Sequence, residues 1–331
     1  MKYSPEIIEH GASVIICCYN SAQRLSATLQ HLADQNLPAD FRMEIIIVDN
    51  GSTDNTAAVA RETWNKAELK NTVLKIVNEP RAGQMFARKT GVAKAEFECV
   101  VFCDDDNRLN KNYVFYAHQL ITKYPYIGAG GGQNLPVTNA IAYPKWFEGY
   151  KNYYGLGIPA ETSGDVSHKT FVLGAGMVTK KSLFLQAFDD KYPTLLNGRN
   201  GEKLSTGDDF EYCKRLLLWG YKLYYDEGMV LHHFIPEERL TLPYRERLMQ
   251  GISDAGIILD EYDLAIRVSR KNKNKSRWRL LILAPFRILF AKLGWSKRAA
   301  IDEELTLFYL SPFHLKKNTS RSIIKDFIKH K

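Results

Sequence analysis

Short apolar runs that alternate with helical patterns are the strongest constraint on the fold of this chain. Residues 12–18 (ASVIICC), 44–48 (EIIIV), 73–77 (VLKIV) and 100–103 (VVFC) are rich in valine and isoleucine. The segments between them carry apolar residues three or four positions apart, as helices do. Strands that alternate with helices at this spacing predict an α/β fold. Its sheet would be doubly wound and mostly parallel, with right-handed crossovers and flanking helices.

The run at 100–103 ends in three consecutive aspartates, Asp104, Asp105 and Asp106. In open α/β sheets the functional crevice lies beyond the carboxyl ends of the strands. Adjacent carboxylates repel one another unless they are solvated, paired or bound to a cation. Hard oxygen ligands suit Mg²⁺ or Mn²⁺, whose coordination is completed by water and substrate phosphates. The triplet therefore predicts a metal and phosphate site, with a solvated acidic turn as the alternative.

Beyond the triplet the pattern is looser. We expect a helix over 113–123, a strand over 170–179 that is broken by Gly174 and Gly176, and a helix over 208–220. Short strands are expected at 221–225 and 229–233, followed by a helical C-terminal part. The polar, glycine-rich stretch 195–207 predicts a loop.

Several classes of protein are disfavoured by what the sequence lacks. The five cysteines form no CxxC pair, so we expect reduced core residues and not a disulfide framework or a zinc site. There is no GxxxxGK[ST] phosphate loop, and Gln133 occupies the last glycine position of a dinucleotide fingerprint near Gly128. No signal-peptide pattern and no uninterrupted apolar stretch of membrane-spanning length is present. We therefore expect a cytoplasmic protein.

Seven segments, taken together and in this order, resemble the family 2 (GT-A fold) inverting glycosyltransferases of bacterial surface-polysaccharide synthesis. They are SVIICCYNSAQRLSATLQHL, EIIIVDNGSTDNT, AGQMFARKTGVAKA, VVFCDDDN, VLGAGMVTKKSL, STGDDFEYCKRLLLWGYKL and LHHFIPEERLT. The resemblance covers about residues 10–245. It implies a GT-A fold and transfer of a sugar from a nucleotide-diphosphate donor, expected to be UDP-linked, to the hydroxyl of a glycan or lipid-linked acceptor.

The resemblance also implies roles for individual residues. Asp106 and His233 would bind Mn²⁺ or Mg²⁺, although His232 is an alternative to His233. Donor-binding positions would be Tyr19, Asn20, Asp49, Arg88, Asp104 and Asp105. Acceptor or diphosphate contacts would come from Gly174, Ala175, Gly176 and Arg239. Asp49 also suits a turn cap, and Arg88 also suits a surface ion pair.

Asp209 takes the position of the general base in this resemblance, and Asp208 stands where the family has glutamate. A general base must be ionised and within reach of the acceptor hydroxyl. The alternative is that both carboxylates only complement the positive end of a helix dipole. Lys89 stands where the family has an asparagine. For Arg215, a structural role and a functional role are both possible interpretations.

The functional expectation is a metal-dependent, inverting glycosyltransferase. One alternative is a sugar nucleotidyltransferase, which has a similar sheet but a glycine-rich loop that residues 17–25 lack. The other is a catalytically inactive module that binds a nucleotide sugar or a membrane.

Charge is distributed unevenly along the chain. Residues 265–331 hold 17 Lys/Arg and 4 Asp/Glu, a net charge of +13, which leaves −5 on the rest of a chain whose total is +8. We expect a catalytic domain over 1–240 and a basic helical extension over 241–331. In the extension, aromatic and basic residues interleave over 276–294, as in interfacial helices that bind anionic lipid. This predicts peripheral contact with the inner face of the cell membrane, and nucleic acid is not an expected partner.

Overall fold

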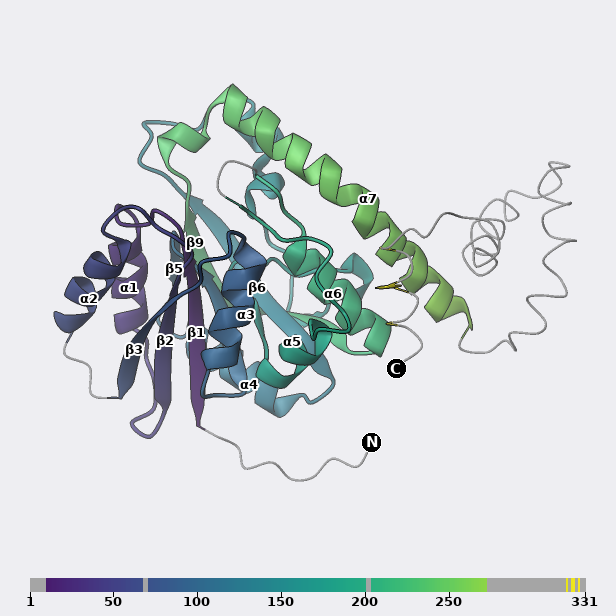
Figure 1. Ribbon diagram of the computed structural model, residues 1–331, viewed down its shortest axis with the longest axis horizontal. Helices are drawn as coiled ribbons and strands as arrows, with labels where there is room; N and C mark the ends of the chain where they lie inside the picture. Colours follow the sequence, from purple (N-terminus) through teal and green to yellow (C-terminus); the bar gives the residue numbers. More distant parts are fainter. Residues whose placement is uncertain are drawn as a thin grey trace, which may run out of the picture. The chain divides into compact units, whose positions relative to one another are not determined.

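The computed structural model describes residues 10–67, 71–200 and 204–272, together with Ser320, Ile323, Ile324 and Phe327. Helices cover both faces of a sheet, which is the α/β fold that the sequence predicts (Figure 1). The strands are β1 (Gly11–Cys18), β2 (Arg42–Asp49), β3 (Thr72–Asn78), β4 (Cys99–Asp104), β5 (Asn107–Leu109), β6 (Ile127–Val137), β7 (Gly164–Asp165), β8 (Val178–Lys180) and β9 (Lys222–Phe234). The α-helices are α1 (Leu25–Ala33), α2 (Thr56–Asn65), α3 (Gln84–Lys94), α4 (Tyr113–Lys123), α5 (Lys181–Ala187), α6 (Asp208–Trp219) and α7 (Leu242–Asn272). Short 3₁₀ helices are η1 (Phe147–Gly149), η2 (Lys151–Tyr154), η3 (Ser167–Lys169) and η4 (Glu237–Arg239).

The sheet is ordered β3-β2-β1-β4-β8-β6-β9-β5, and β7 pairs with β9. The long ladders are parallel: β3, β2, β1 and β4 pair in parallel, and so do β6 and β9. The short strands β5, β7 and β8 pair antiparallel with their neighbours. Because β1, β2 and β4 run in the same direction, their carboxyl ends meet at one edge of the sheet, where ligands bind in such folds.

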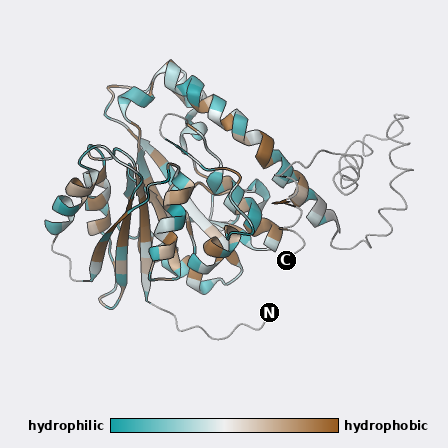
Figure 2. Cartoon of the chain, viewed as in Figure 1, coloured by the Kyte–Doolittle hydropathy of each residue, from teal (hydrophilic) through white to brown (hydrophobic). Residues whose placement is uncertain are grey.

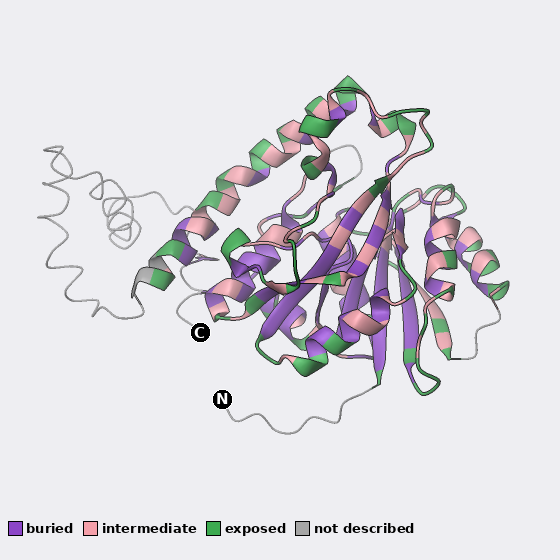
Figure 3. Ribbon diagram, turned by 180° about the vertical axis from the view of Figure 1, so that it is seen from behind, coloured by how far each residue is buried: buried purple, intermediate pink, exposed green. Residues whose placement is uncertain are grey.

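The central strand β1 is buried on both faces. Ala12, Val14 and Ile16 pack with α1, α2 and α4, whereas Ile15 packs with α3, α5 and α6. Successive side chains of a strand point to opposite faces, so a strand that is covered on both sides needs a continuous apolar run. Figure 2 shows the central strands coloured as hydrophobic, and Figure 3 shows the same strands as buried.

The prediction of a strand over 170–179 is wrong for most of that range. Only Val178–Lys180 form a strand, and the preceding residues form a loop. Thr170 and Gly176 have φ angles of +65° and +81°, which a strand does not allow. A Cβ atom at Gly176 would also lie 2.2 Å from the Tyr113 hydroxyl, so only glycine fits there. The loop is thereby held against the end of β4.

The two strands predicted at 221–225 and 229–233 are one strand, β9. Its pairing with β6 shifts in register between Gly131 and Gln133, which accommodates residues 226–229 as an irregularity in a continuous strand. β9 then pairs with β5 so that His233 lies opposite Asn107. This pairing brings the end of β9 to the aspartate triplet.

The chain divides into two compact units, Met1–Ile257 and Ile258–Lys331. The division falls within α7, whose first residues pack in the first unit, where Tyr244 and Leu248 contact Phe147 and Tyr154. The expected boundary at residue 240 stays a prediction. Residues 276–294, the expected membrane-contacting segment, lie outside the described residues. Within the described part of the chain, no helix has the length and hydrophobicity needed to cross a bilayer.

Candidate active site

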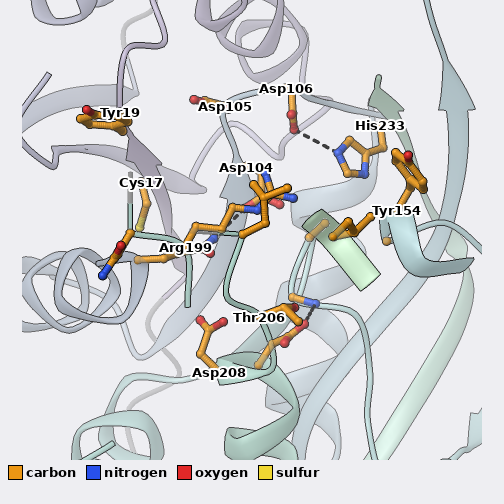
Figure 4. Close-up of a pocket in the computed structure, with 18 of the residues that line it drawn as sticks. Cys17, Tyr19, Asp104, Asp105, Asp106, Tyr154, Arg199, Thr206, Asp208 and His233 are labelled. Atoms are coloured by element: carbon orange, nitrogen blue, oxygen red, sulfur yellow. Dashed lines mark hydrogen bonds and ion pairs between the residues drawn. The ribbon is translucent and has the colours of Figure 1, made fainter. Parts of the chain in front are cut away.

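A cavity of about 440 Å³ lies where β1, β2 and β4 end (Figure 4). Its walls come from the residues after these strands, the 173–175 loop, the start of α6 and the end of β9. Most of the residues predicted from the sequence line this cavity: Tyr19, Arg88, Asp104, Asp105, Asp106, Gly174, Ala175, Asp208, Asp209, His233 and Arg239. Asn20, Asp49 and Gly176 do not line it. The fold therefore gathers six separate sequence segments into one site.

The three aspartates of the triplet have three different environments, because a tight turn follows β4. Asp105 is held by Arg24, which donates from Nε at 2.8 Å and from Nη2 at 2.6 Å. The Ser21 hydroxyl also donates to Asp105. These bonds tie the start of α1 to the end of β4, so the Asp105 carboxylate is already fully engaged by the protein.

Asp106 points toward the end of β9 and the 3₁₀ turn η4 that follows it. His233 Nε2 lies 3.4 Å from Asp106 Oδ1, and Arg239 Nη1 donates to Asp106 Oδ2 at 2.8 Å. Burial alone would raise the pKa of Asp106, but the neighbouring His233 and Arg239 outweigh it and hold this pKa well below its usual range. Asp106 is therefore an anion at any physiological pH.

Asp104, the last residue of β4, forms no ion pair with any residue that the structure describes. The nearest hydrogen-bond donor is Gln84 Nε2, at 3.5 Å. Burial and repulsion from Asp106 raise the pKa of Asp104, and the charge of Arg88 opposes that rise. A ligand that brings positive charge or hydroxyl donors would stabilise the ionised form of Asp104.

Asp106 and His233 lie close enough together for one metal ion to contact both. Asp106 Oδ1 is buried without a hydrogen-bond partner and faces His233 Nε2. Two adjacent ligands of an octahedral Mg²⁺ lie about 3 Å apart, which is close to the observed separation. In the described ranges, no group of three or more His, Cys, Asp or Glu side chains is arranged to hold a metal. An ion here would thus keep positions for water and phosphate oxygens.

Asp208 and Asp209 open α6 and face the same cavity. Arg88 Nη1 donates to Asp208 Oδ2 at 2.7 Å, and both side chains are nearly fully buried. Asp209 instead accepts backbone N–H bonds from Gly174 at 2.8 Å and from Phe210 at 3.0 Å. Burial, followed by repulsion from Asp208, raises the pKa of Asp209 from 3.8 to about 6. A carboxyl group with this pKa suits proton transfer near neutral pH.

Gly174 explains how the 173–175 loop approaches the carboxylates so closely. A Cβ atom at this position would lie 2.8 Å from Asp209 Oδ2 and 2.9 Å from Arg88 Nη2. Only a residue without a side chain leaves room for both groups, so the glycine sets the position of Asp209. The prediction that this loop borders the site agrees with its place in the cavity wall.

Arg88 lies deeper in the site than a residue that stacks on an exposed base. Its guanidinium is buried, pairs with Asp208 and lies 5.1 Å from the centre of the Phe102 ring. The alternative of a surface ion pair is excluded by this burial. The predicted contact of Arg88 with the donor base stays a prediction, and the observed contacts place its charge among Asp104, Asp208 and Asp209.

Asn20 and Asp49 shape the turns beside the cavity. Asn20, with φ of +50°, accepts the Thr53 N–H at 2.8 Å, and Asp49 accepts the Ser52 N–H at 2.9 Å. Asn50, which the sequence did not single out, lines the cavity and donates to the carbonyls of Glu79 and Arg81. Asp49 thus has the cap role that was its alternative reading, and a donor contact stays a prediction.

Sequence reasoning missed several other residues of the cavity wall, namely Arg24, Gln84, Tyr153, Tyr154, Arg199 and Tyr244. Arg24 reads as an ordinary helix residue because its partner, Asp105, is 81 positions away. Arg199 lies in a polar loop where a lone arginine carries no signal. The density of aromatic residues over 143–154 was the one available sequence clue to Tyr153 and Tyr154.

Residues 13–168 match the model of the family described as Glycosyl transferase family 2. The match thus covers just under half of this chain. Poly-beta-1,6-N-acetyl-D-glucosamine synthase of Staphylococcus epidermidis is 30% identical over 122 residues, which are 37% of this chain and 28% of that protein. Poly(ribitol-phosphate) beta-N-acetylglucosaminyltransferase TarS of Staphylococcus aureus is 35% identical over 99 residues, which are 30% of this chain and 17% of that protein. The matched family 2 segment thus spans less than a third of these relatives.

A solved structure supports the fold over nearly the whole length of the chain. The crystal structure of S. aureus TarS residues 1–349 in complex with UDP-GlcNAc has a TM-score of 0.52 and 19% identity, and covers 96% of this chain and 89% of that one. At this identity the likeness establishes the fold. The expected fold is therefore confirmed, and the family match over residues 13–168 agrees with the expected resemblance.

Proposed function

We propose that this protein transfers a sugar, with inversion, from a nucleotide-diphosphate sugar to an acceptor hydroxyl. The observation that carries the proposal is the placement of two chemically different carboxylate sets in one cavity. Asp104 and Asp106 stand at the end of β4 beside His233, and Asp209 stands at the start of α6. The first set suits a diphosphate and its cation, and the second suits a base. The family 2 domain and the names of its relatives support the same reaction class.

Asp209 is the proposed general base. Its carboxylate would take the proton of the acceptor hydroxyl, whose oxygen forms the new bond to the anomeric carbon of the donor. The bond from that carbon to the diphosphate breaks, and the nucleoside diphosphate leaves with the electron pair. The two backbone N–H groups of Gly174 and Phe210 hold the Asp209 carboxylate in place. A pKa of about 6 leaves this base ionised at neutral pH and still basic enough to accept a proton.

The proposed donor is a UDP-sugar, and the proposed cofactor is Mn²⁺ or Mg²⁺ held by Asp106 and His233. TarS, which shares the fold, was crystallised with UDP-GlcNAc, which supports the choice of nucleotide. A bound divalent ion would neutralise charge that develops on the leaving diphosphate. Asp104 would accept hydrogen bonds from donor hydroxyls, and Asp105 would keep the turn in shape through Arg24 and Ser21.

The proposed acceptor is a glycan or a lipid-linked sugar, and the protein would work at the cytoplasmic face of a membrane. Support comes from the relatives, whose names specify a polysaccharide product in one case and a poly(ribitol-phosphate) acceptor in the other. The net charge of +13 on residues 265–331 supports contact with anionic lipid.

A panel of nucleotide sugars tests the proposal, with release of nucleoside diphosphate as the readout and with Mn²⁺, Mg²⁺ or EDTA present. We expect slow, metal-stimulated hydrolysis of one donor, which Asp209→Asn depresses and the surface change Arg61→Ala does not. Formation of pyrophosphate from a nucleoside triphosphate and a sugar phosphate would show a nucleotidyltransferase instead. Donor binding without hydrolysis or transfer to any glycan would support the inactive module.

A further inference from the structure

The charged side chains of the cavity are mostly paired with one another. Arg24 pairs with Asp105, Arg88 with Asp208 and Arg239 with Asp106. The charge of each of these guanidinium groups is neutralised by a carboxylate of the protein. An incoming diphosphate, which carries two or more negative charges, would meet a site whose arginines are engaged.

Arg199 is the exception among the cavity-lining arginines in the described part of the chain. Its guanidinium makes no hydrogen bond and no ion pair with any described residue, and its side chain is exposed to the cavity. Figure 4 shows Arg199 reaching into the middle of the cavity beside Asp104. Its positive charge is among those that act on the neighbouring carboxylates of Asp104 and Asp106.

The backbone that carries Arg199 is anchored to the catalytic core. The carbonyl of Arg199 accepts the Gln84 N–H at 2.9 Å, and the carbonyl of Asn197 accepts the Met85 N–H at 3.1 Å. Gly198 lies between these two residues with φ of +67°, and a Cβ atom there would lie 2.9 Å from Asp208 Oδ1. The loop is therefore fixed at the start of α3 and against α6, and Arg199 projects from a defined point.

A buried ion pair holds the preceding residues of the same loop. Glu211 and Arg215 are one turn apart on α6, are fully buried, and lie 2.7 Å apart. Glu211 accepts the N–H groups of Leu195 and Leu196, while Arg215 donates to the carbonyls of residues 187, 192 and 193. The pair therefore fixes the loop on its path from α5 to the cavity.

We propose that Arg199 binds the diphosphate of the donor. The other arginines of the cavity are paired with carboxylates, so Arg199 would supply the positive charge that the diphosphate needs. This inference rests on the proposed function. An arginine fork donates two parallel hydrogen bonds to phosphate oxygens, which makes it more selective for this group than a lysine. Arg199 stands beside Asp104 and Asp106, where the diphosphate would lie if Asp106 and His233 bind its cation. The loop residue would thus complete the phosphate site opposite the end of β4.

Calorimetric titration with UDP, UMP and uridine in the presence of Mn²⁺ tests this assignment on the full chain. For Arg199→Ala we expect the Kd for UDP to rise about tenfold or more, the range of one lost charge-assisted contact. Uridine affinity should change less than twofold, because the nucleoside carries no phosphate. Arg199→Lys should give an intermediate Kd for UDP, since it keeps the charge and loses the fork. Arg61→Ala, an exposed arginine of α2 outside the cavity, is the matched control and should bind UDP as the wild type does.

Equal UDP affinity in the wild type and in Arg199→Ala would overturn the inference and leave the proposed function standing. An equal loss of affinity for UDP and uridine, or a lowered Tm in the variant, would assign Arg199 a role in loop structure and also overturn it. Failure of the wild type to bind any of UDP, GDP, ADP, CDP or TDP would refute the proposed function, and this inference with it.

Discussion

Asp209→Asn separates catalysis from stability at a single position. The substitution keeps the size of the side chain and one acceptor for the N–H of Gly174, but it removes the ionisable group. If Asp209 is the general base, turnover should fall by about two or more orders of magnitude, while donor affinity changes little. The same change removes a carboxylate whose ionised form is disfavoured in the folded protein, because burial and Asp208 raise its pKa.

The pKa of about 6 fixes the expected pH dependence of the wild type. About a tenth of the Asp209 side chains would be ionised at pH 5 and about nine-tenths at pH 7, so kcat/KM should rise about tenfold over this range. The profile should bend near pH 6 in the free enzyme. The residual kcat/KM of Asp209→Asn should not show this rise between pH 5 and pH 7, because asparagine does not titrate.

The stability of the fold should depend on pH in the opposite direction. A folded pKa of about 6 against an ordinary 3.8 means that the folded protein binds a proton that the unfolded chain has already released. The contribution of Asp209 to stability is therefore greatest below about pH 4 and falls as pH rises through 6. The total loss is on the order of 2–3 kcal/mol, from 1.36 kcal/mol for each pKa unit. Asp209→Asn escapes this loss, so its stability relative to the wild type should increase from pH 4 to pH 7.

Two measurements check this reasoning on the same protein samples. Urea denaturation at pH 4, 5, 6 and 7 gives the free energy of unfolding of both proteins, and donor hydrolysis over the same range gives kcat/KM. Arg61→Ala serves as a control for substitution at an unrelated surface position. A difference in unfolding free energy between variant and wild type that stays constant with pH would refute the raised pKa. Unchanged turnover in Asp209→Asn would refute the role as base.

Three further predictions concern the metal, the loop and the C-terminal part. Asp106→Asn should abolish the Mn²⁺ dependence of UDP binding while the protein stays folded, and titrations with and without EDTA check this. Arg215→Met should lower the free energy of unfolding by about 3–5 kcal/mol in urea titrations, since the buried Glu211 carboxylate loses the charge of Arg215; an effect below 1 kcal/mol would contradict the role of the pair. A chain that ends at Ala265 should lose flotation with anionic vesicles and keep UDP binding, because each nearby basic residue contributes about 1 kcal/mol; equal flotation of both chains would exclude the tail as the anchor.

The architecture of the first hundred residues was predictable because each strand and helix is encoded locally. An apolar run such as 12–18 can bury the side chains on both of its faces only between two layers of helices. The polar turn after each run marks the end of a strand. The rule that ligands bind at those ends then placed Asp104 and Asp106 in the site without any coordinates. Asp209 followed from the resemblance, and its place in the cavity agrees with that assignment.

The prediction of a strand over 170–179, broken by Gly174 and Gly176, failed for most of that range because of long-range contacts that the sequence does not reveal. Apolar and β-branched residues there favour a strand, yet contacts of Gly174 with Asp209 and of Gly176 with Tyr113 impose a loop. Both partners are distant in sequence. Tertiary packing therefore overrode the local preference at a point where the backbone borders the cavity.

The sequence by itself determined the alternating fold, the edge of the sheet that carries the site and the types of side chain available there. Only the tertiary structure decided how the charges are paired: Asp105 with Arg24, Asp106 with Arg239, Asp208 with Arg88, and Arg199 with none of the described residues. Those partners are 81, 133 and 120 positions apart along the chain. The hydrophobic periodicity of a sequence indicates only how residues a few positions apart are arranged. An ion pair depends instead on the distance between atoms that folding brings together.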